Sequence, residues 1–373
     1  MPFPVLRFSL AAAVAALLLS ACSTVAPQDG AAPAAQASRI APWQPRAGHA
    51  RPVIAVIGAQ QGTELSDFMV PYGLLSDSGS AEVLALADED GPLASFTDMG
   101  APGFRIQAQA TLAGFDVQHP EGADYVVVPA LRENPAILAW LKAQAGKGAT
   151  LVSICNGGMV VADTGIMAGR RATAHWSTEE HRMEHLAAVH WVKNARYVVD
   201  GNWISSSGIS AGIPVSLALV EAIAGSERAH ALGQQLGVDA WSARHDSDAF
   251  QLQPGTAWPL AKVAYTNRWL HDQDRYGIAA AAGVDEVVLA LMADAWSSTG
   301  RSHAYLIGLG PLRTRNGLTI LPDDTPAPGA LLTVSDLVPG KTLDAALDGI
   351  AERYGRSTAR GVALVFEYPG FKD

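Results

Sequence analysis

The residues with the clearest chemical potential lie where an apolar run ends at a cysteine. Residues 150–154 are apolar and rich in β-branched types, as expected of a buried strand, and Cys155 follows directly. Gly157 and Gly158 come next, before a helix-forming segment at 159–163. A thiol at a turn from strand to helix has its thiolate favoured by the unpaired N–H groups and dipole of the helix N-terminus.

Small residues flank Cys155 at the two positions where a nucleophile elbow requires them. Strand and helix backbones nearly touch in that turn, so the residues two before and two after the nucleophile must be small. Here they are Ser153 and Gly157. The pattern predicts a reactive thiol, and the alternative is a buried core cysteine without chemistry.

The first residues predict export. Arg7 and the apolar run at 8–19 resemble a secretory signal, and the run is too short to span a membrane. The sequence Leu-Ser-Ala-Cys at 19–22 resembles the lipobox of bacterial lipoproteins, which implies that Cys22 becomes a lipidated first residue. The alternatives are an ordinary secretory peptide cut near Ala21 and an uncut membrane anchor.

On this interpretation, residues 1–22 are a lipoprotein signal peptide and residues 23–50, rich in Ala, Pro, Gln and Ser, are a flexible tether. The protein would be held by the lipid on Cys22 at the periplasmic side of a bacterial cell envelope, and Ser23 favours the outer membrane. Cys155 is then the only thiol left in an oxidising compartment and has no partner for an intramolecular disulfide.

Composition indicates a globular protein that does not bind nucleic acid. The apolar fraction is 49% and the charged fraction 17% in 373 residues, a length comfortable for two domains. The formal net charge of -10 opposes contact with phosphate backbones, which require a basic face.

Strands and helices are predicted to alternate from residue 51 onward. Continuous apolar runs are typical of strands buried on both faces of a parallel sheet, and helical spacing occurs between them. The expected strands are 51–58, 82–87, 123–129 and 150–154, and the expected helices are 64–75 and 135–146. This alternation predicts an α/β fold with a doubly wound, mostly parallel sheet. Ligands of such sheets bind at the carboxyl ends of the strands, where Cys155 lies.

Five short motifs occur in a fixed order along this part of the chain. They are GAQQGTELSDFMVP at 58–71, VVVP at 126–129, SICNG at 153–157, GRRATAHW at 169–176 and SSGISAG at 206–212. Together they resemble the ThiJ/PfpI superfamily, which has the flavodoxin-like, class I glutamine amidotransferase-like fold. The resemblance covers about residues 52–250 and is nearest to the isonitrile hydratases and the sensor domains of AraC-type regulators.

The resemblance implies roles for two side chains. Cys155 would be the nucleophile. Asp67, four residues before Pro71, would be the carboxylate that hydrogen-bonds the thiol and moves its proton in general acid–base steps. Glu64 lies one helical turn away and is the competing acid.

One histidine and three backbone groups would complete that site. His175 matches the histidine that approaches the cysteine in several members, and the alternative is a helix-capping or buried structural histidine. The N–H groups of Asn156 and Gly157 would stabilise negative charge that develops on a substrate. Where the family usually has Pro-Gly-Gly, this chain has Pro-Ala-Leu. Ala130 thus stands where a further donor often lies, with Leu131 reshaping the site.

Two histidine motifs are weighed as metal sites and set aside. Residues 181–185, HRMEH, match an inverted zinc-protease signature, but no third ligand is evident nearby and the segment is expected on a surface helix. Residues 245–248, HDSD, are more typical of a solvated turn. No metal and no cofactor are therefore expected.

The C-terminal part resembles a degenerate copy of the first domain. Aligning Gly62 with Gly283 predicts a strand at 277–282, a helix at 285–296 and a strand at 302–307, and 317–322 resembles a later strand. In this register Asp67 becomes Val288, and no cysteine follows Cys155, so the copy lacks the chemistry.

The expected domain organisation follows from this alignment. A ThiJ/PfpI-like domain at 51–250 and a degenerate partial repeat at 276–373 are joined by a linker at 251–275. The repeat is expected to pack beside the first domain as a pseudo-partner. This arrangement predicts a monomer or pseudo-dimer, with a homodimer as the alternative.

The leading functional hypothesis is a cysteine-dependent hydrolase or hydratase that acts on a small electrophile, namely a carbonyl, isonitrile or amide. The Cys155 thiolate would attack, Asp67 would relay the proton and water would complete the turnover. The alternative is a non-catalytic small-molecule or redox sensing module of the AraC-sensor type, which the sensor-like motifs and the altered Pro-Ala-Leu loop favour. A structural lipoprotein with a relic site is the third hypothesis.

Overall fold

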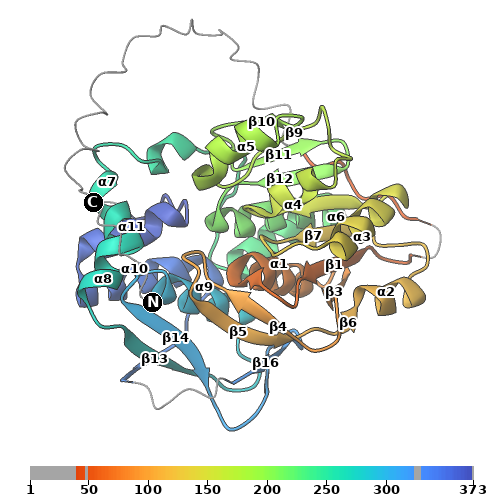
Figure 1. The fold of residues 1–373 in the computed structure, drawn as a ribbon. Helices are drawn as coiled ribbons and strands as arrows, with labels where there is room; N and C mark the ends of the chain where they lie inside the picture. Colours follow the sequence, from red (N-terminus) through yellow and green to blue (C-terminus); the bar gives the residue numbers. More distant parts are fainter. Residues whose placement is uncertain (1–38, 47–48, 323–328, 372–373) are drawn as a thin grey trace, which may run out of the picture. The chain divides into compact units, whose positions relative to one another are not determined.

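A seven-stranded sheet forms the centre of the protein in the computed structural model, which describes residues 39–46, 49–322 and 329–371 (Figure 1). Its strands lie in the order β11-β12-β8-β7-β1-β3-β6, and all neighbours are parallel except β11 and β12. The bounds are β1 Val53–Gly58, β3 Glu82–Ala87, β6 Ala110–Thr111, β7 Tyr125–Val128, β8 Thr150–Ser153, β11 Tyr197–Asp200 and β12 Trp203–Ser206. This sheet confirms the predicted α/β fold.

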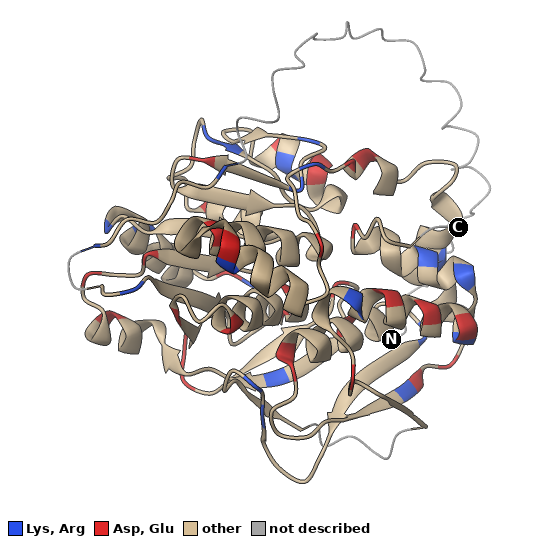
Figure 2. Cartoon of the chain, turned by 180° about the vertical axis from the view of Figure 1, so that it is seen from behind, with Lys and Arg blue, Asp and Glu red and all other residues tan. Residues whose placement is uncertain are grey.

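The central strands β1 and β7 are apolar along their whole length because their side chains contribute to two cores. In β1, Ile54 and Val56 belong to one core, whereas Val53, Ala55 and Ile57 belong to the other. Successive side chains of a strand point to opposite faces, so a continuous apolar run needs helices on both faces of the sheet. In Figure 2 the charged residues accordingly lie mainly on helices and loops.

Helices cover both faces of the sheet. α1 (Leu65–Asp77) and α6 (Gly212–Gln235) pack in the first core, whereas α2 (Leu112–Gln118), α3 (Pro135–Gly146) and α4 (Gly157–Asp163) pack in the second. α5 (Glu179–His185) lies near the surface, next to the two-stranded pair β9 (Arg171–Ala172) and β10 (His190–Trp191).

The segment 209–236, which contains α6, is the one candidate membrane span among the described residues, by length and composition alone. Its mean hydropathy is 1.6, and half of the apolar window is buried within the protein. Gly225, with φ 85° and ψ 166°, interrupts the helix. Core packing accounts for this hydrophobicity, because a helix buried inside a protein is apolar for the same reason as a membrane span.

The C-terminal part adds a parallel sheet and several helices. The sheet has the order β14-β13-β17, with β13 Asp274–Ala279, β14 Ser302–Ile307 and β17 Ala330–Leu332. The helices are α9 Glu286–Ser297, α10 Thr342–Tyr354 and α11 Arg356–Val365. The segment 251–275, predicted as a linker, contains α7 (Ala257–Ala261), a π-helical turn at Lys262–Thr266, α8 (Asn267–Leu270) and the start of β13.

Helix α9 packs against α1 in the middle of the molecule (Figure 1). Gly73 of α1 permits the close approach, since a Cβ there would lie 2.8 Å from side-chain carbons of Glu286 and Val287. Asp285 caps α9 with its side chain as Glu64 caps α1, in the register expected of the repeat. The C-terminal part therefore lies directly against the helix that carries Asp67.

A second sheet joins the two parts of the chain. Its order is β15-β16-β5-β4-β2, with β2 Thr63–Glu64, β4 Pro92–Phe96, β5 Pro102–Gln107, β15 Leu312–Arg313 and β16 Thr319–Leu321. The strand predicted at 317–322 is present as β16, but it pairs antiparallel with β5 of the first domain instead of joining a sheet of the repeat. The described part of the chain consequently forms one compact unit.

The N-terminal features fall largely outside the described residues. Cys22, the predicted signal peptide at 1–22 and residues 23–38 of the predicted tether lie there. The end of the tether is bound to the domain, because Trp43 N–H donates to Ala222 O at 2.9 Å and its Nε1 donates to Asp124 Oδ1 at 3.1 Å.

Candidate active site

Cys155 occupies a strained turn at the end of β8. Its φ is 54°, a left-handed value that non-glycine residues rarely adopt, and its N–H donates to Ser207 O at 3.1 Å. Helix α4 begins two residues later at Gly157, where a Cβ would lie 2.0 Å from Val128 O. The turn thus has the geometry of a nucleophile elbow, with its thiol at the carboxyl end of the sheet.

Asp67 faces the thiol from the first turn of α1. Its carboxyl group lies near enough to the Cys155 thiol for each group to affect the pKa of the other. Its Oδ2 accepts the Ala130 N–H at 3.1 Å, whereas its Oδ1 is buried without a hydrogen-bond partner. Glu64 is the N-cap of the same helix and accepts the Asp67 N–H at 2.5 Å. The structure therefore brings Cys155 and Asp67 together, and Glu64 supports the backbone that carries Asp67.

Burial controls the protonation of this pair. Burial, followed by the charge of Asp67, raises the pKa of the Cys155 thiol well above its ordinary value. Burial also raises the pKa of Asp67 to about 8, although the hydrogen bond from Ala130 opposes this shift. At pH 7 the pair consequently consists mainly of a thiol and a carboxylic acid, and a proton leaves it only near pH 8.

A further carboxyl group, Asp294, reaches this site from the C-terminal part. It is fully buried in α9, where it accepts the Ser66 hydroxyl at 2.6 Å and the Asp98 N–H at 3.1 Å. Burial and the Asp294 charge, in this order, raise the pKa of Glu64 well above its ordinary value. Sequence reasoning missed Asp294, whose signal is a single acidic residue inside the otherwise apolar stretch VVLALMADAW at 287–296.

The three backbone N–H groups expected to bind an oxyanion differ in whether they already donate to another atom of the protein. Gly157 N–H donates to Ile154 O at 2.8 Å, and Ala130 N–H is bound to Asp67. Asn156 N–H points at the thiol and opposes the rise of its pKa. Asn156 is thus the one of the three that faces the sulfur, and a substrate oxygen would have to compete for the other two donors.

His175 makes its hydrogen bonds away from Cys155. Its Nδ1 accepts the Ser177 N–H at 3.2 Å, and its Nε2 lies 2.7 Å from Val365 O and donates to it. This pattern requires the neutral imidazole, in agreement with burial, which lowers the pKa of His175. His175 also caps the short helical turn at Trp176–Thr178. Both ring nitrogens are therefore engaged in the structural contacts that were the alternative to catalysis.

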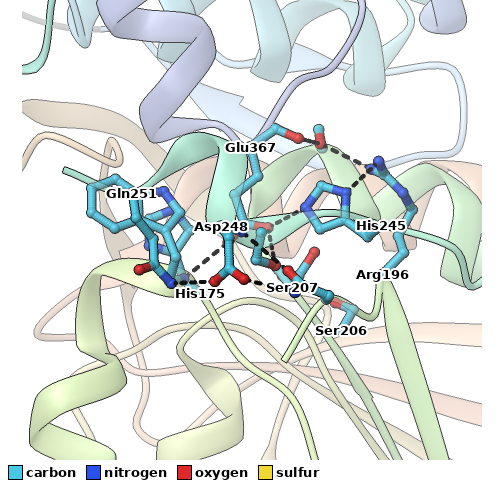
Figure 3. Close-up of polar contacts among 12 residues, drawn as sticks. His175, Arg196, Ser206, Ser207, His245, Asp248, Gln251 and Glu367 are labelled. Carbon is cyan, nitrogen blue, oxygen red and sulfur yellow. Dashed lines mark hydrogen bonds and ion pairs between the residues drawn. The ribbon is translucent and has the colours of Figure 1, made fainter. Parts of the chain in front are cut away.

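Glu367 organises the surroundings of His175 (Figure 3). Its Oε1 accepts the Trp176 N–H at 2.9 Å, and its Oε2 lies 2.6 Å from His245 Nε2. Arg196 donates to His245 Nδ1 at 2.8 Å from the other side. Burial alone would raise the pKa of Glu367, but the hydrogen bond with His245 and the two histidines lower it to about 2.

The expectation that residues 245–248 form a solvated turn is wrong for His245, whose side chain is 2% exposed. Its partner Glu367 is 122 positions further along the chain, so no local sequence pattern predicts their contact. By contrast, His181 and His185 of the HRMEH motif are exposed on α5, with ring centroids 4.6 Å apart.

The candidate site is closed in this structure. Cys155 and Asp67 are each 1% exposed and His175 is 2% exposed. On the side of His175, the residues after α11 form the cover: Ser210 N–H donates to Phe366 O at 3.1 Å, and the Ser210 hydroxyl donates to Glu367 O at 2.6 Å. A ligand reaches the sulfur only if some of these groups move.

A doubly wound sheet with an elbow cysteine and an acid in the first helical turn defines an α/β protein of the flavodoxin-like, class I glutamine amidotransferase-like class. The DJ-1/PfpI family model matches residues 53–222, and the chain belongs to this family. This confirms the resemblance found in the motifs.

Individual relatives show the same similarity. An isonitrile hydratase from Pseudomonas putida is 28% identical over 176 residues, which are 46% of this chain and 72% of the relative. A deglycase from Pyrococcus horikoshii is 30% identical over 146 residues, 38% of this chain and 81% of the relative. The crystal structure of DJ-1beta from Drosophila melanogaster, 22% identical, covers 50% of this chain and 98% of its own, with a TM-score of 0.44.

Proposed function

We propose that the chain is a cysteine-dependent hydrolase or hydratase that acts on a small electrophile with a C=O, amide or isonitrile group. The observation that carries the proposal is the pairing of Asp67 with the strained Cys155 at the end of β8. Its relatives include an isonitrile hydratase and a deglycase, whose names fit addition chemistry at small carbon electrophiles.

The protonation of Cys155 and Asp67 supports this chemistry. Because the pKa of Asp67 is about 8, the pair loses one proton in the range where enzymes work. The remaining proton can be on sulfur or on the Asp67 carboxyl group. When this proton is on Asp67, sulfur is a thiolate and the Asp67 carboxylic acid can protonate the substrate.

The proposed reaction begins with attack of Cys155 Sγ on the electrophilic carbon. A carbon–sulfur bond forms while one π bond of the substrate breaks, and Asp67 transfers the former thiol proton to the substrate atom that gains the electron pair. From an isonitrile the adduct is a thioimidate, and water adds to its C=N bond before the carbon–sulfur bond breaks. From an amide the tetrahedral adduct first expels the amine, which leaves with the former thiol proton, and water then attacks the resulting thioester. From an aldehyde the hemithioacetal carbon loses sulfur as water takes its place. In each case sulfur leaves as the thiolate and recovers its proton from the attacking water. Asn156 N–H, which acts on the sulfur, can stabilise negative charge that develops beside it.

Turnover of a panel of aldehydes, isonitriles and amides between pH 6 and 9.5 tests this proposal. We expect activity to rise with pH around a midpoint near 8, to vanish in Cys155→Ala and to fall about 10²- to 10⁴-fold in Asp67→Asn. Activity that survives in Cys155→Ala would contradict a covalent mechanism.

A sensing or binding role is the second candidate, and one observation favours it. The thiol is 1% exposed and its pKa is raised by burial, properties of a cysteine that does not react until the protein opens. This role would be favoured if no compound of the panel is turned over and if a ligand stabilises the folded protein only when Cys155 is present.

We further propose that the protein is an exported lipoprotein attached through Cys22, and that the C-terminal part replaces a second subunit. The packing of α9 on α1 supports the latter proposal. Sedimentation velocity tests it: a monomer is expected, whereas a tight homodimer formed through α1 would exclude it.

A further inference from the structure

A cluster of metal-ligating side chains lies at the edge of the sheet opposite Cys155. Among the residues that the structure describes, His49, His119 and Glu121 are the one group of three such side chains whose ligand atoms all lie within 4.8 Å of one another. His49 precedes β1, and the other two precede β7, so the cluster lies at the amino ends of two neighbouring parallel strands. Cys155 follows the carboxyl end of β8, which runs parallel to β7.

Asp124 holds His49 in the orientation that a metal ligand requires. The Oδ2 atom of Asp124 lies 2.5 Å from His49 Nδ1 and also accepts the Val53 N–H at 2.9 Å. Asp124 is 5% exposed and His49 is 7% exposed. A carboxylate at one ring nitrogen fixes the tautomer with the proton on that nitrogen, which leaves the lone pair of Nε2 for a metal.

A tight turn presents the other two side chains. Gly122 N–H donates to His119 O at 2.9 Å, and Gly122 adopts φ 84°, so His119 and Glu121 project from the same turn. Arg46 donates to Glu121 O at 3.1 Å, and the His119 ring stacks on Phe115 with centroids 4.7 Å apart. The turn and one ring are thereby oriented by contacts that do not involve the ligand atoms.

The distances and the donor set suit a small divalent ion. Glu121 Oε1 lies 3.0 Å from His49 Nε2, and ligand atoms bound tetrahedrally at about 2.1 Å from a metal are about 3.4 Å apart. Two imidazoles and one carboxylate bind zinc with a fourth position left for water.

We propose that His49, His119 and Glu121 bind one Zn²⁺ ion, with Asp124 as the hydrogen-bond partner that orients His49. The ion fastens the segment before β1 to the turn before β7, and its role is structural because it lies at the strand ends opposite Cys155. Sequence reasoning expected no metal, since His49 is far along the chain from the other two ligands and nothing local connects them.

An alternative explanation of the same contacts is a cluster of ion pairs that contains no metal. In that case a protonated His49 would donate to both Asp124 and Glu121. His119 separates the two explanations, because these ion pairs do not involve it, whereas the zinc site requires its nitrogen. A substitution of His119 that keeps an aromatic ring stacked on Phe115 therefore distinguishes the two explanations.

The test uses the full chain, stripped with a chelator and titrated with ZnCl₂ in a calorimeter, with thermal unfolding followed in parallel. We expect one Zn²⁺ per chain and a higher unfolding midpoint with zinc, because the ion binds the folded state. His119→Phe is expected to lower the zinc affinity by at least about tenfold and to remove the gain in midpoint. Asp124→Asn is expected to lower the affinity about 10- to 100-fold.

The exposed pair on α5 supplies the matched control. His185→Ala removes one member of the His181/His185 pair and is expected to leave stoichiometry and affinity unchanged. No bound zinc, an affinity that His119→Phe leaves unchanged, or binding lost in His185→Ala would overturn the proposal. None of these outcomes depends on the chemistry of Cys155, so this site and the proposed enzyme fail or succeed separately.

Discussion

The hydroxyl group of Ser66 donates a 2.6 Å hydrogen bond to the carboxylate of Asp294. Ser66 immediately precedes Asp67 in α1, and Asp294 belongs to α9 of the C-terminal part. The part of the chain that lacks its own cysteine therefore contributes a buried acid to the surroundings of the candidate site. Its influence is electrostatic, because its charge adds to burial in raising the pKa of Asp67.

Asp294→Asn is expected to lower the pKa of Asp67 below its value of about 8. The substitution removes a negative charge that disfavours the ionised form of Asp67 while it keeps an oxygen that can accept the Ser66 hydroxyl. A carbon-detected NMR titration of the Asp67 carboxyl group measures the change. Asp348→Asn, on an exposed position of α10, is the control and should leave that titration in place.

Alkylation of Cys155 is expected to be slow at pH 7 and to accelerate with pH. Burial raises the pKa of the thiol and the Asp67 charge adds to this shift, so the thiolate fraction increases about tenfold per pH unit throughout the accessible range. Asp67→Asn removes the charge, and its labelling by iodoacetamide should be faster at any given pH above 8. Intact-mass measurements follow the reaction. Rapid labelling of the wild type at pH 6 would contradict the buried, neutral thiol.

The sequence was sufficient to predict the elements that depend on local apolar pattern. The strand expected at 82–87 and the helix expected at 135–146 coincide with β3 and α3, because an apolar run and a helical repeat each suffice to define a buried element. The elbow at Cys155 was recognisable for a similar reason, since small residues must flank such a turn.

Contacts between distant segments could not be predicted in the same way. The hairpin β4–β5 and its pairing with β16 were not expected, because antiparallel pairing of Ile106 with Ile320 leaves no trace in either segment alone. The burial of His245 depends on Glu367, and polar residues enter a core only with such a partner. A sequence pattern describes one element at a time, and these features belong to pairs of elements.

Glu367→Gln is expected to destabilise the folded protein. It is also expected to make the free energy of unfolding depend less on pH in the acid range. Burial opposes ionisation of Glu367, but the hydrogen bond with His245 outweighs burial and lowers the pKa to about 2. A depressed carboxyl pKa stabilises the fold above the unfolded value near 4.5, and this contribution is lost as pH falls toward 2. The difference amounts to about 3 kcal/mol at pH 7.

Urea unfolding at pH 7 and at pH 3 measures this contribution. The wild type should lose stability between the two pH values by more than Glu367→Gln does. Glu352→Gln, an exposed change on α10, serves as the control and should behave as the wild type. Equal losses in all three proteins would show that Glu367 is not ionised in the fold.

Gly157→Ala is expected to disrupt the elbow. A Cβ at this position would lie 2.0 Å from Val128 O and 2.8 Å from the Pro129 carbonyl carbon, both backbone atoms that can move only if β7 moves. Overpacking of this kind costs about 1–3 kcal/mol, so the free energy of unfolding should fall by at least that amount. Gly146→Ala is the matched control, because a Cβ at the end of α3 meets nothing within 4 Å and alanine favours the helix. Thermal unfolding compares the two variants, and a Gly157→Ala protein as stable as Gly146→Ala would mean that strand and helix do not approach as closely as this turn requires.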